Sequence, residues 1–167
     1  AILTTRAEWT DQKGALSDTV IAAIRKKFQM GWWGVSLRLY GRETINREAY
    51  AILESEMNKL KPLSMKRTSW KRGDPLEMTG WTGTPLTFPM QNANWHGGLG
   101  GHIGFSPVLP QSGSAAMEQF RRTYQRYQEF GMDYQASFAF GERHLINVNA
   151  ILLDKDDPDM MRRVDPF

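Results

Sequence analysis

Residues 92–107 read Asn-Ala-Asn-Trp-His-Gly-Gly-Leu-Gly-Gly-His-Ile-Gly-Phe-Ser-Pro, and this stretch is more informative than any other in the chain. Four of the five positions 97–101 are glycine. Backbone without side chains can turn through positive φ at little steric cost, or can let a bulky, flat group lie against it. The residues alone fit a flexible loop equally well. The stretch therefore predicts either a flexible loop or a surface for a planar molecule.

Composition places the chain among folded proteins of one domain or two small ones. It has 167 residues, of which 41% are hydrophobic and 11% aromatic, enough to bury a core. The formal net charge is +3, and charged residues are spread along the chain. The basic stretch 66–72 could touch phosphate, but it is more typical of a solvated strand end. Cysteine is absent, which excludes disulfides, thiolate zinc sites and a cysteine nucleophile.

No stretch of the sequence indicates a membrane span or a secretion signal. The apolar runs stay well short of the ~18 residues that a spanning helix requires, and no basic-then-apolar leader is visible. The chain begins at Ala1 without methionine and stops at Phe167, and we expect it to be a piece of a longer protein. We expect a cytoplasmic location, with the periplasm as the alternative.

Hydrophobic periodicity predicts a first group of elements. Apolar residues recur at helical spacing in residues 17–29 and again in residues 47–60. Alternation of apolar and polar residues predicts a half-buried strand at 33–40, and another strand follows at 63–70. Residues 71–101 are rich in glycine and proline, and a structureless loop of this length is usually functional.

A second group of elements repeats the order of the first. We expect a strand at 103–109, a helix that Ser114 caps and Gly131 ends, a strand at 134–140 and a last strand at 145–153. Strand, helix, strand therefore appears twice. This order predicts an α+β fold of ferredoxin-like type, in which helices cover antiparallel sheets.

The predicted domain organisation follows from this repeat. We expect residues 1–167 to form a single domain with two subunits of structure, at about 14–70 and 102–160, which the loop 71–101 joins.

The last predicted strand has two unlike faces. One face carries an ordinary apolar row, which we expect to be buried, and the other carries Asn147 and Asn149 before it becomes apolar. Asparagine is unfavourable in strands, and two asparagines on one face require hydrogen-bond partners if they are buried. An amide both donates and accepts hydrogen bonds, so it suits the edge of a heterocycle. A pair of ordinary edge-strand amides is the equal alternative. The expected buried row is Ile146, Val148, Ala150 and Leu152.

Motifs for other chemistries are absent from the sequence. His96 and His102 lie six residues apart, too loosely spaced for a strong metal motif, so we predict no metal site. We find no phosphate loop, no dinucleotide fingerprint and no serine nucleophile motif. The sequence identifies no catalytic residue.

The order and spacing of several short segments resemble the cap domain of the vanillyl-alcohol oxidase and p-cresol methylhydroxylase family of FAD-linked oxidases. The resemblance runs from about residue 14 to the end and is weakest across residues 62–90. The segments that carry it are Asn94-Trp95, the glycines, Phe105-Ser106-Pro107, Gly131-Met132-Asp133-Tyr134, Gly141-Glu142-Arg143, Asp154-Lys155-Asp156-Asp157-Pro158 and Arg162-Arg163.

The resemblance implies a function. In this family a separate domain holds FAD, and the cap covers the isoalloxazine ring and shapes the substrate cavity. The enzymes oxidise para-substituted phenols by hydride transfer from the benzylic carbon to the flavin, which oxygen or a cytochrome then reoxidises. The implied partners are the FAD-binding domain of the same polypeptide, a phenolic substrate, and a cytochrome or a second copy of the chain. The chain alone would not be catalytic.

The chain departs from the family where the family attaches FAD covalently. One branch uses a histidine of a His-His pair, which aligns here with Ile146 and Asn147. The other branch uses a tyrosine, which aligns here with Ala93. None of these side chains can form the bond, so the resemblance implies FAD that is bound without a covalent link. An acidic cap residue of the second branch aligns with Ser137, which cannot serve as a base.

Four residues are our candidates for contact with flavin or substrate. Trp95 would supply a wall, Arg143 an anion partner, and Asn147 and Asn149 polar contacts. The competing hypothesis is a free-standing ferredoxin-like module that binds RNA or a protein. RNA binding is disfavoured because the strands lack the aromatic and basic signature of an RNA-recognition motif.

Overall fold

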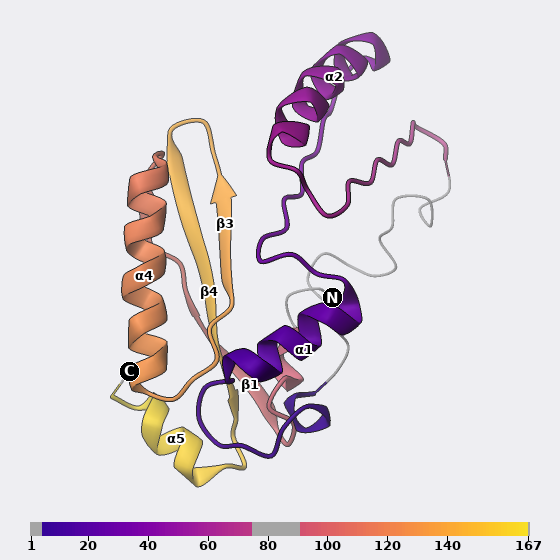
Figure 1. Cartoon of the computed structure of the whole chain (residues 1–167). Coiled ribbons are helices and arrows are strands. Elements are labelled where there is room, and N and C mark those ends of the chain that lie inside the picture. The colour runs from indigo at the N-terminus through magenta and orange to yellow at the C-terminus, as the bar shows by residue number, and fades with distance from the viewer. Residues whose placement is uncertain (1–4, 75–90, 167) are drawn as a thin grey trace. The chain divides into compact units, whose positions relative to one another are not determined.

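The computed structural model describes residues 5–74 and 91–166. The described residues form two compact units (Figure 1). Residues 5–21 and 91–166 form the first, which we call the sheet unit, and residues 22–74 form the second, the helix unit. The division differs from the expected one, because residues 14–21 and 91–101 belong with the second strand–helix–strand group.

One long strand organises the sheet unit. Strand β4, His144–Asp154, pairs antiparallel with β1, Gly100–Phe105, and with β2, Val108–Pro110, on one edge. Strand β3, Ala136–Phe140, pairs with β4 antiparallel as well. The predicted strand at 103–109 is thus found as two strands.

The strands β1 and β2 follow a single line along β4. The pairing runs from Gly100 opposite Asp154 to Phe105 opposite Asn149, and resumes in the same register at Val108 opposite Ile146. Between the two strands, the Asn147 N–H donates to the carbonyl of Pro107 over 3.0 Å. The break at residues 106–107 therefore interrupts the ladder without shifting it.

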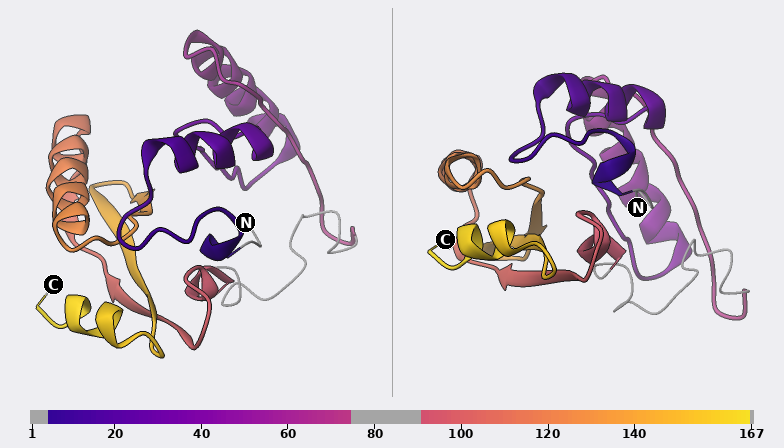
Figure 2. Two further views of the ribbon diagram at one scale, coloured as in Figure 1. Left: turned by 60° about the horizontal axis from the view of Figure 1, so that its bottom comes forward. Right: turned by 90° about the horizontal axis from the view of Figure 1, so that it is seen from below.

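Helix α4, Gly113–Glu129, links β2 to β3 and covers one face of the sheet (Figures 1 and 2). It confirms the predicted helix, but its cap is Ser112 rather than Ser114. Ser112 is in extended conformation, so its hydroxyl can accept the Ala115 N–H over 3.2 Å. The helix ends as predicted at Gly131, whose φ of 61° is favourable only for a residue without a side chain.

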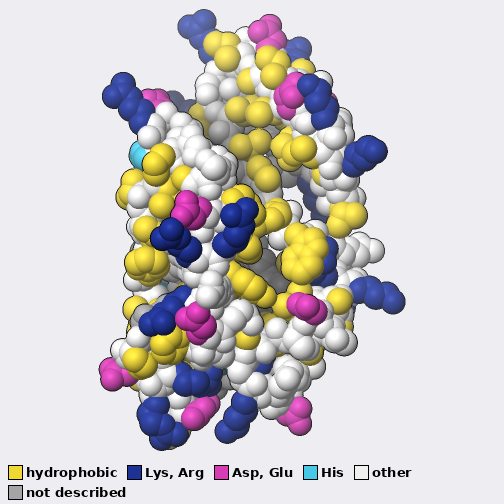
Figure 3. Space-filling view, turned by 60° about the vertical axis from the view of Figure 1, so that its left-hand side comes forward, with side chains coloured by type: hydrophobic (Ala, Val, Ile, Leu, Met, Phe, Trp, Pro, Cys, Tyr) yellow, Lys and Arg dark blue, Asp and Glu magenta, His cyan; other side chains and the backbone are white. Residues whose placement is uncertain are grey.

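The core of the sheet unit lies between α4, β4 and the short helix α5, Pro158–Val164. Burial of each of its large apolar side chains stabilises the fold by about 1.5–3 kcal/mol. The outer surface of α4 is charged, with ion pairs of Glu118 with Arg122 and of Glu129 with Arg126. Figure 3 shows basic and acidic side chains interspersed on the face toward the viewer. The core residues are Tyr127, Met132, Ile151, Leu153, Met160 and Val164.

The two faces of β4 are reversed relative to expectation. Asn147 and Asn149 are the buried residues, with exposed fractions of 0% and 3%, whereas Val148 is 44% exposed. Leu152 is buried as expected, and Ile146 and Ala150 are half-buried. Hydrophobicity placed the apolar row inward, but the face of a strand is fixed by the layer that covers it. Here α4 covers the asparagine face, and the amides find partners there.

The helix unit contains the two helices that the sequence predicts. Helix α1, Asp18–Phe28, crosses from the sheet unit into it, and the Ser17 hydroxyl accepts the Val20 N–H at its start over 3.4 Å. Helix α2, Glu43–Lys59, begins one turn earlier than expected. Its half-buried side chains recur at helical spacing, as predicted: Asn46, Ala49, Tyr50, Leu53 and Met57.

The two strands predicted for the first half of the chain are wrong. Residues 33–40 and 63–70 form no strand. Alternation indicates an extended chain with unlike faces, but a strand also needs a partner for its backbone hydrogen bonds. Within the described residues neither segment has such a ladder, and Val35 and Leu37 are 64% and 56% exposed. The α+β class is confirmed, while the ferredoxin-like repeat is not found in the described residues.

Much of the predicted loop 71–101 lies outside the described residues, since positions 75–90 are not described. Its last part forms a short 3₁₀ helix, η3, Gln91–Asn94, that packs against β1 and β4. In the described parts of the chain, none of the helices combines the length and apolar character needed to cross a bilayer.

Candidate functional site

The glycine-rich stretch is explained in part by contacts within the chain. A side chain at Gly100 would meet the carbonyl oxygen of Ala93 at 2.5 Å, because η3 lies directly on this strand. Gly98 has a φ of 55°, and a side chain there would collide with the carboxylate of Asp154. These two glycines therefore serve the fold itself. Gly104 differs from them, because an added Cβ would meet no atom within 4 Å.

The residues around Trp95 form the most connected polar cluster of the sheet unit. The indole N–H of Trp95 donates to Oδ2 of Asp133 over 2.8 Å. Arg6 forms an ion pair with the same carboxylate oxygen and donates through Nη2 to the carbonyl of Gln12 over 2.8 Å. The backbone N–H of Leu16 donates to Oδ1 of Asp133 over 2.7 Å. Asp133 thus binds two segments that are distant from it in sequence, residues 6–16 and Trp95.

His96 lies beside this cluster, and its buried Nε2 atom has no hydrogen-bond partner among the described residues. Burial lowers the pKa of His96, and the positive charges of Arg6 and Arg163 act in the same direction. The carboxylates of Asp133 and Asp154 oppose this shift. His96 is therefore a neutral, partly buried imidazole near neutral pH.

The other histidines lie elsewhere on the sheet and are exposed. His102 is in β1 and His144 starts β4. In the described part of the chain, no group of three His, Asp or Glu side chains is placed to hold a metal ion.

Asn147 and Asn149 form a polar cluster beneath α4. The Asn147 side chain donates to the Ser137 carbonyl over 3.1 Å and accepts from the Asn149 amide over 2.7 Å. Oδ1 of Asn149 is buried and has no hydrogen-bond partner among the described residues. Burial raises the pKa of the nearby Tyr134 phenol, and its interactions with Asn147 and Thr123 oppose that shift.

The structure does not bring the four predicted site residues together. Trp95 belongs to the Asp133 cluster, whereas Asn147 and Asn149 lie inside the interface with α4. Arg143 is exposed in the turn between β3 and β4. Strand β4 is 11 residues long, or about 35 Å, and Arg143 precedes its first residue while η3 packs toward its far end.

A candidate surface that the sequence interpretation missed is the sheet face opposite α4, which we call the open face. The pairing places Gly104 beside Ala150, Ser137 beside Val148, and Ala139 beside Ile146 on this face. Most of these side chains are small, and Gly104, Ser137, Ala139 and Val148 are exposed. The small residues Gly104, Ser137, Ala139 and Ala150 are the signal in the sequence for this surface, but the pattern predicts that the row containing Ala150 belongs to the core.

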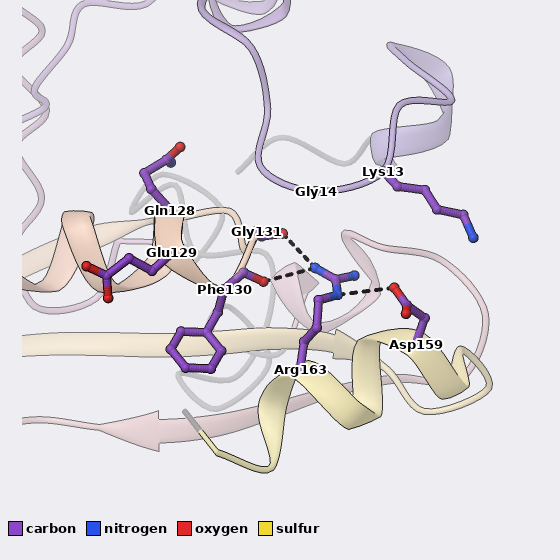
Figure 4. A pocket seen from close by; sticks show the side chains of 8 residues that line it. All are labelled: Lys13, Gly14, Gln128, Glu129, Phe130, Gly131, Asp159 and Arg163. Carbon is purple, nitrogen blue, oxygen red and sulfur yellow. Dashed lines mark hydrogen bonds and ion pairs between the residues drawn. The ribbon is translucent and has the colours of Figure 1, made fainter.

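A shallow groove of about 440 Å³ lies where α4 ends near α5 (Figure 4). Arg163 crosses it, donating to the carbonyls of Phe130 and Gly131 over 3.1 and 2.8 Å and pairing with Asp159 over 3.3 Å. The guanidinium therefore satisfies carbonyls at the end of α4, and its role here is that of a helix cap.

Comparison with solved structures shows in which proteins a similar fold occurs. The chain superposes on p-cresol methylhydroxylase with substrate bound with a TM-score of 0.82, at 28% identity over 98% of this chain and 32% of that one. It also superposes on 4-ethylphenol oxidase from Gulosibacter chungangensis, in its isoeugenol complex, with a TM-score of 0.72, at 23% identity over 96% and 32% of the two chains. The α+β fold is therefore one found in a part of these enzymes.

Comparison with characterised sequences confirms the resemblance to the vanillyl-alcohol oxidase and p-cresol methylhydroxylase family. The chain is homologous to the 4-cresol dehydrogenase [hydroxylating] flavoprotein subunit of Pseudomonas putida, with 26% identity over 164 residues. The match covers 96% of this chain and 31% of the relative, so the chain spans about a third of the proteins it matches. No family model matches the chain.

Proposed function

We propose that this chain is the substrate-side cap of an FAD-dependent enzyme that oxidises para-substituted phenols. The observation that carries the proposal is the superposition of 98% of the chain on part of p-cresol methylhydroxylase at 28% identity. The homologous sequence is a flavoprotein subunit as well. Electrons would leave the benzylic carbon as a hydride, and a separate domain of the same polypeptide would hold the cofactor.

The open face is the surface that supports this role best. Its pairs of small residues, such as Gly104 with Ala150, leave an even surface on which a planar ring can lie. On the opposite face α4 covers Asn147 and Asn149, and the amide of Asn147 is engaged with Ser137 and Asn149 inside the chain. We therefore propose the open face as the cavity wall. Trp95, beside the end of the sheet, and exposed Arg143 stay candidates for contact with flavin or substrate.

The residues present fit a cofactor that is held without a covalent bond. Asn147 is fully buried and hydrogen-bonded, and Ile146 has no reactive atom. Ala93 packs its backbone against Gly100. When bound, FAD supplies an acceptor for two electrons. The contribution of this chain is to cover the reacting ring, keep water away and orient the substrate.

A flavin reduction experiment tests the proposed function. The full flavoprotein that contains this chain is mixed anaerobically with 4-cresol, and the visible flavin absorbance is recorded. We expect bleaching with 4-cresol and none with its methyl ether, which lacks the ionisable hydroxyl. Absence of bound flavin, or flavin that neither compound reduces, would contradict the proposal.

A denaturation experiment tests the mode of cofactor binding. The same protein is unfolded in acid and separated from small molecules. We expect all flavin in the small-molecule fraction. Flavin that stays with the polypeptide would show a covalent attachment and contradict this part of the proposal.

A further inference from the structure

Asp133 occupies an unusual position between α4 and β3. Both of its carboxylate oxygens are used: Oδ1 accepts the backbone N–H of Leu16, and Oδ2 accepts the indole N–H of Trp95 and the ion pair from Arg6. The segment between Arg6 and Leu16 is therefore held at both ends by one carboxylate. No part of the proposed function so far requires this residue.

The carboxylate of Asp133 is itself fixed in orientation. Its side chain is 11% exposed and that of Arg6 is 9% exposed, so the ion pair is largely shielded from water. Arg6 cannot swing away freely, because its other terminal nitrogen donates to the Gln12 carbonyl over 2.8 Å. Breaking a buried pair by removing one partner is strongly destabilising. The acceptor that faces the Trp95 indole is therefore a rigid one.

The main chain of Trp95 is held as well. Its carbonyl accepts the Arg6 N–H over 2.7 Å, and its own N–H donates to the Asn92 carbonyl over 3.0 Å. With the backbone fixed by Arg6 and the indole fixed by Asp133, the ring has a single orientation. A tryptophan that only filled space would require apolar contacts around its ring and no hydrogen bond from its indole N–H.

We infer that Asp133 is a positioning residue that sets the orientation of the Trp95 indole, and with it the way in which this side chain meets flavin or substrate beside the end of the sheet. The inference rests on the proposed function as far as the cavity is concerned. Asp133 itself touches no cofactor or substrate in this role. It acts through its hydrogen bond with the indole N–H. This group has a single hydrogen to donate, so the position of the acceptor fixes the direction of the bond.

Indole hydrogen exchange in the unmodified protein gives the first test. The indole resonance of Trp95 is assigned as the one that disappears in Trp95→Phe, and its exchange with deuterium is measured. We expect exchange at least about tenfold slower than for Trp32, which is 70% exposed, because a hydrogen bond to a charged acceptor must open first. Equal rates for the two indoles would overturn the inference without any change to Asp133.

The variant Asp133→Asn gives the second test, with Asp157→Asn as the control. Asp157 is a carboxylate that caps α5 by accepting the backbone N–H groups of Asp159 and Met160, whereas Asp133 accepts the indole N–H of Trp95. We expect Asp133→Asn to shift the Trp95 indole resonance and to speed its exchange about tenfold or more, since the charge of the acceptor is lost. We expect Asp157→Asn to do neither. An unshifted resonance in folded Asp133→Asn would overturn the inference.

The flavoprotein gives the functional test. We expect Asp133→Asn to raise KM for the phenol several-fold, to alter kcat little and to shift the visible flavin spectrum. Unchanged KM and spectrum would overturn the positioning role. Because the indole measurements need no flavin, failure of the proposed function and failure of this inference are distinguishable.

Discussion

The side-chain amide of Asn149 donates to Oδ1 of Asn147 over 2.7 Å, in the interface between the sheet and α4. Both residues lie on the same face of β4, two positions apart, and both are almost fully buried. The side-chain amide of Asn147 in turn donates a hydrogen bond to the carbonyl of Ser137. Most of the polar groups of these two side chains therefore have a hydrogen-bond partner within the chain, without a ligand.

This arrangement predicts that Asn147→Ala destabilises the sheet unit by about 1–3 kcal/mol, because the buried Asn149 amide and the Ser137 carbonyl lose their hydrogen-bond partner. Urea unfolding followed by circular dichroism measures the effect. Val148→Thr is the matched control, since Val148 neighbours Asn147 but faces the open side, and we expect its effect to stay within about 0.5 kcal/mol. A control that costs more than Asn147→Ala would contradict the assignment of the two faces.

Glycines 100 and 104 are predicted to respond oppositely to alanine. Gly100→Ala places a methyl group 2.5 Å from the Ala93 carbonyl, and overpacking of this kind costs about 1–3 kcal/mol. Gly104→Ala meets no atom within 4 Å, and we expect it to stabilise the strand by about 0.5 kcal/mol. Thermal unfolding of the two variants distinguishes them. Similar melting temperatures would show that η3 does not lie on β1.

Asp157 is predicted to stabilise α5 in a pH-dependent way. Its Oδ1 accepts the N–H groups of Asp159 and Met160 over 2.9 and 3.2 Å. The hydrogen bond from Met160, followed by that from Asp159, lowers the pKa of this carboxyl below its ordinary value. A lowered pKa stabilises the folded state above the unfolded value of about 4, and this contribution disappears as the pH falls through the folded value.

We therefore expect Asp157→Ala to cost about 1 kcal/mol at neutral pH, and less than that in acid. Asp157→Asn keeps a hydrogen-bond acceptor but cannot titrate. It should therefore retain much of the stability and lose the part of the pH dependence that Asp157 contributes. Stability curves between about pH 7 and pH 2 measure both effects. A constant difference between wild type and Asp157→Asn over this range would contradict the prediction.

Tyr127 is predicted to limit stability in alkali. Its side chain is 1% exposed, and burial raises the pKa of its phenol above the ordinary value, with a smaller contribution from Tyr134. The folded state keeps the proton while the unfolded state loses it above about pH 10. Stability therefore falls as the pH rises beyond that point.

The variant Tyr127→Phe should show a shallower loss of stability between about pH 9 and pH 11 than the wild type. Tyr124→Phe is the control, since the Tyr124 ring is 41% exposed. Denaturant unfolding at each pH measures the slopes. Identical slopes for Tyr127→Phe and the wild type would show that this phenol ionises in the folded state.

Local periodicity predicted the elements of the sheet unit well. Helix α4 and strands β3 and β4 fall within one or two residues of their expected bounds, because each combines a regular pattern with a clear end signal such as Gly131. The segment 33–40 shows the limit of the method. Its alternation is as regular as that of β3, but pairing is a property of two segments and cannot be derived from one.

The candidate site shows the same limit. Trp95 was identified from its place beside the glycines, but Arg6 and Asp133 were not, since they are separated by 127 positions. Only the fold brings them together. The two asparagines of β4 are unusual strand residues, as predicted, but hydrophobicity predicts the wrong face for them, because it cannot reveal that they hydrogen-bond to each other and to the backbone carbonyl of Ser137 beneath α4.

The order of strands has a consequence for synthesis. Strand β4 lies between β1 and β2 on one edge and β3 on the other, and it is the last strand of the sheet in the chain. The outer strands cannot pair with each other across the gap that it fills. On the ribosome, β2 and β3 therefore lack their partner until residues 144–149 have left the exit tunnel, and β1 lacks its partner until residues 149–154 have followed. During that interval the unpaired strands of the nascent polypeptide can pair wrongly. Slow translation of residues 100–154 would lengthen the interval and increase the requirement for chaperones.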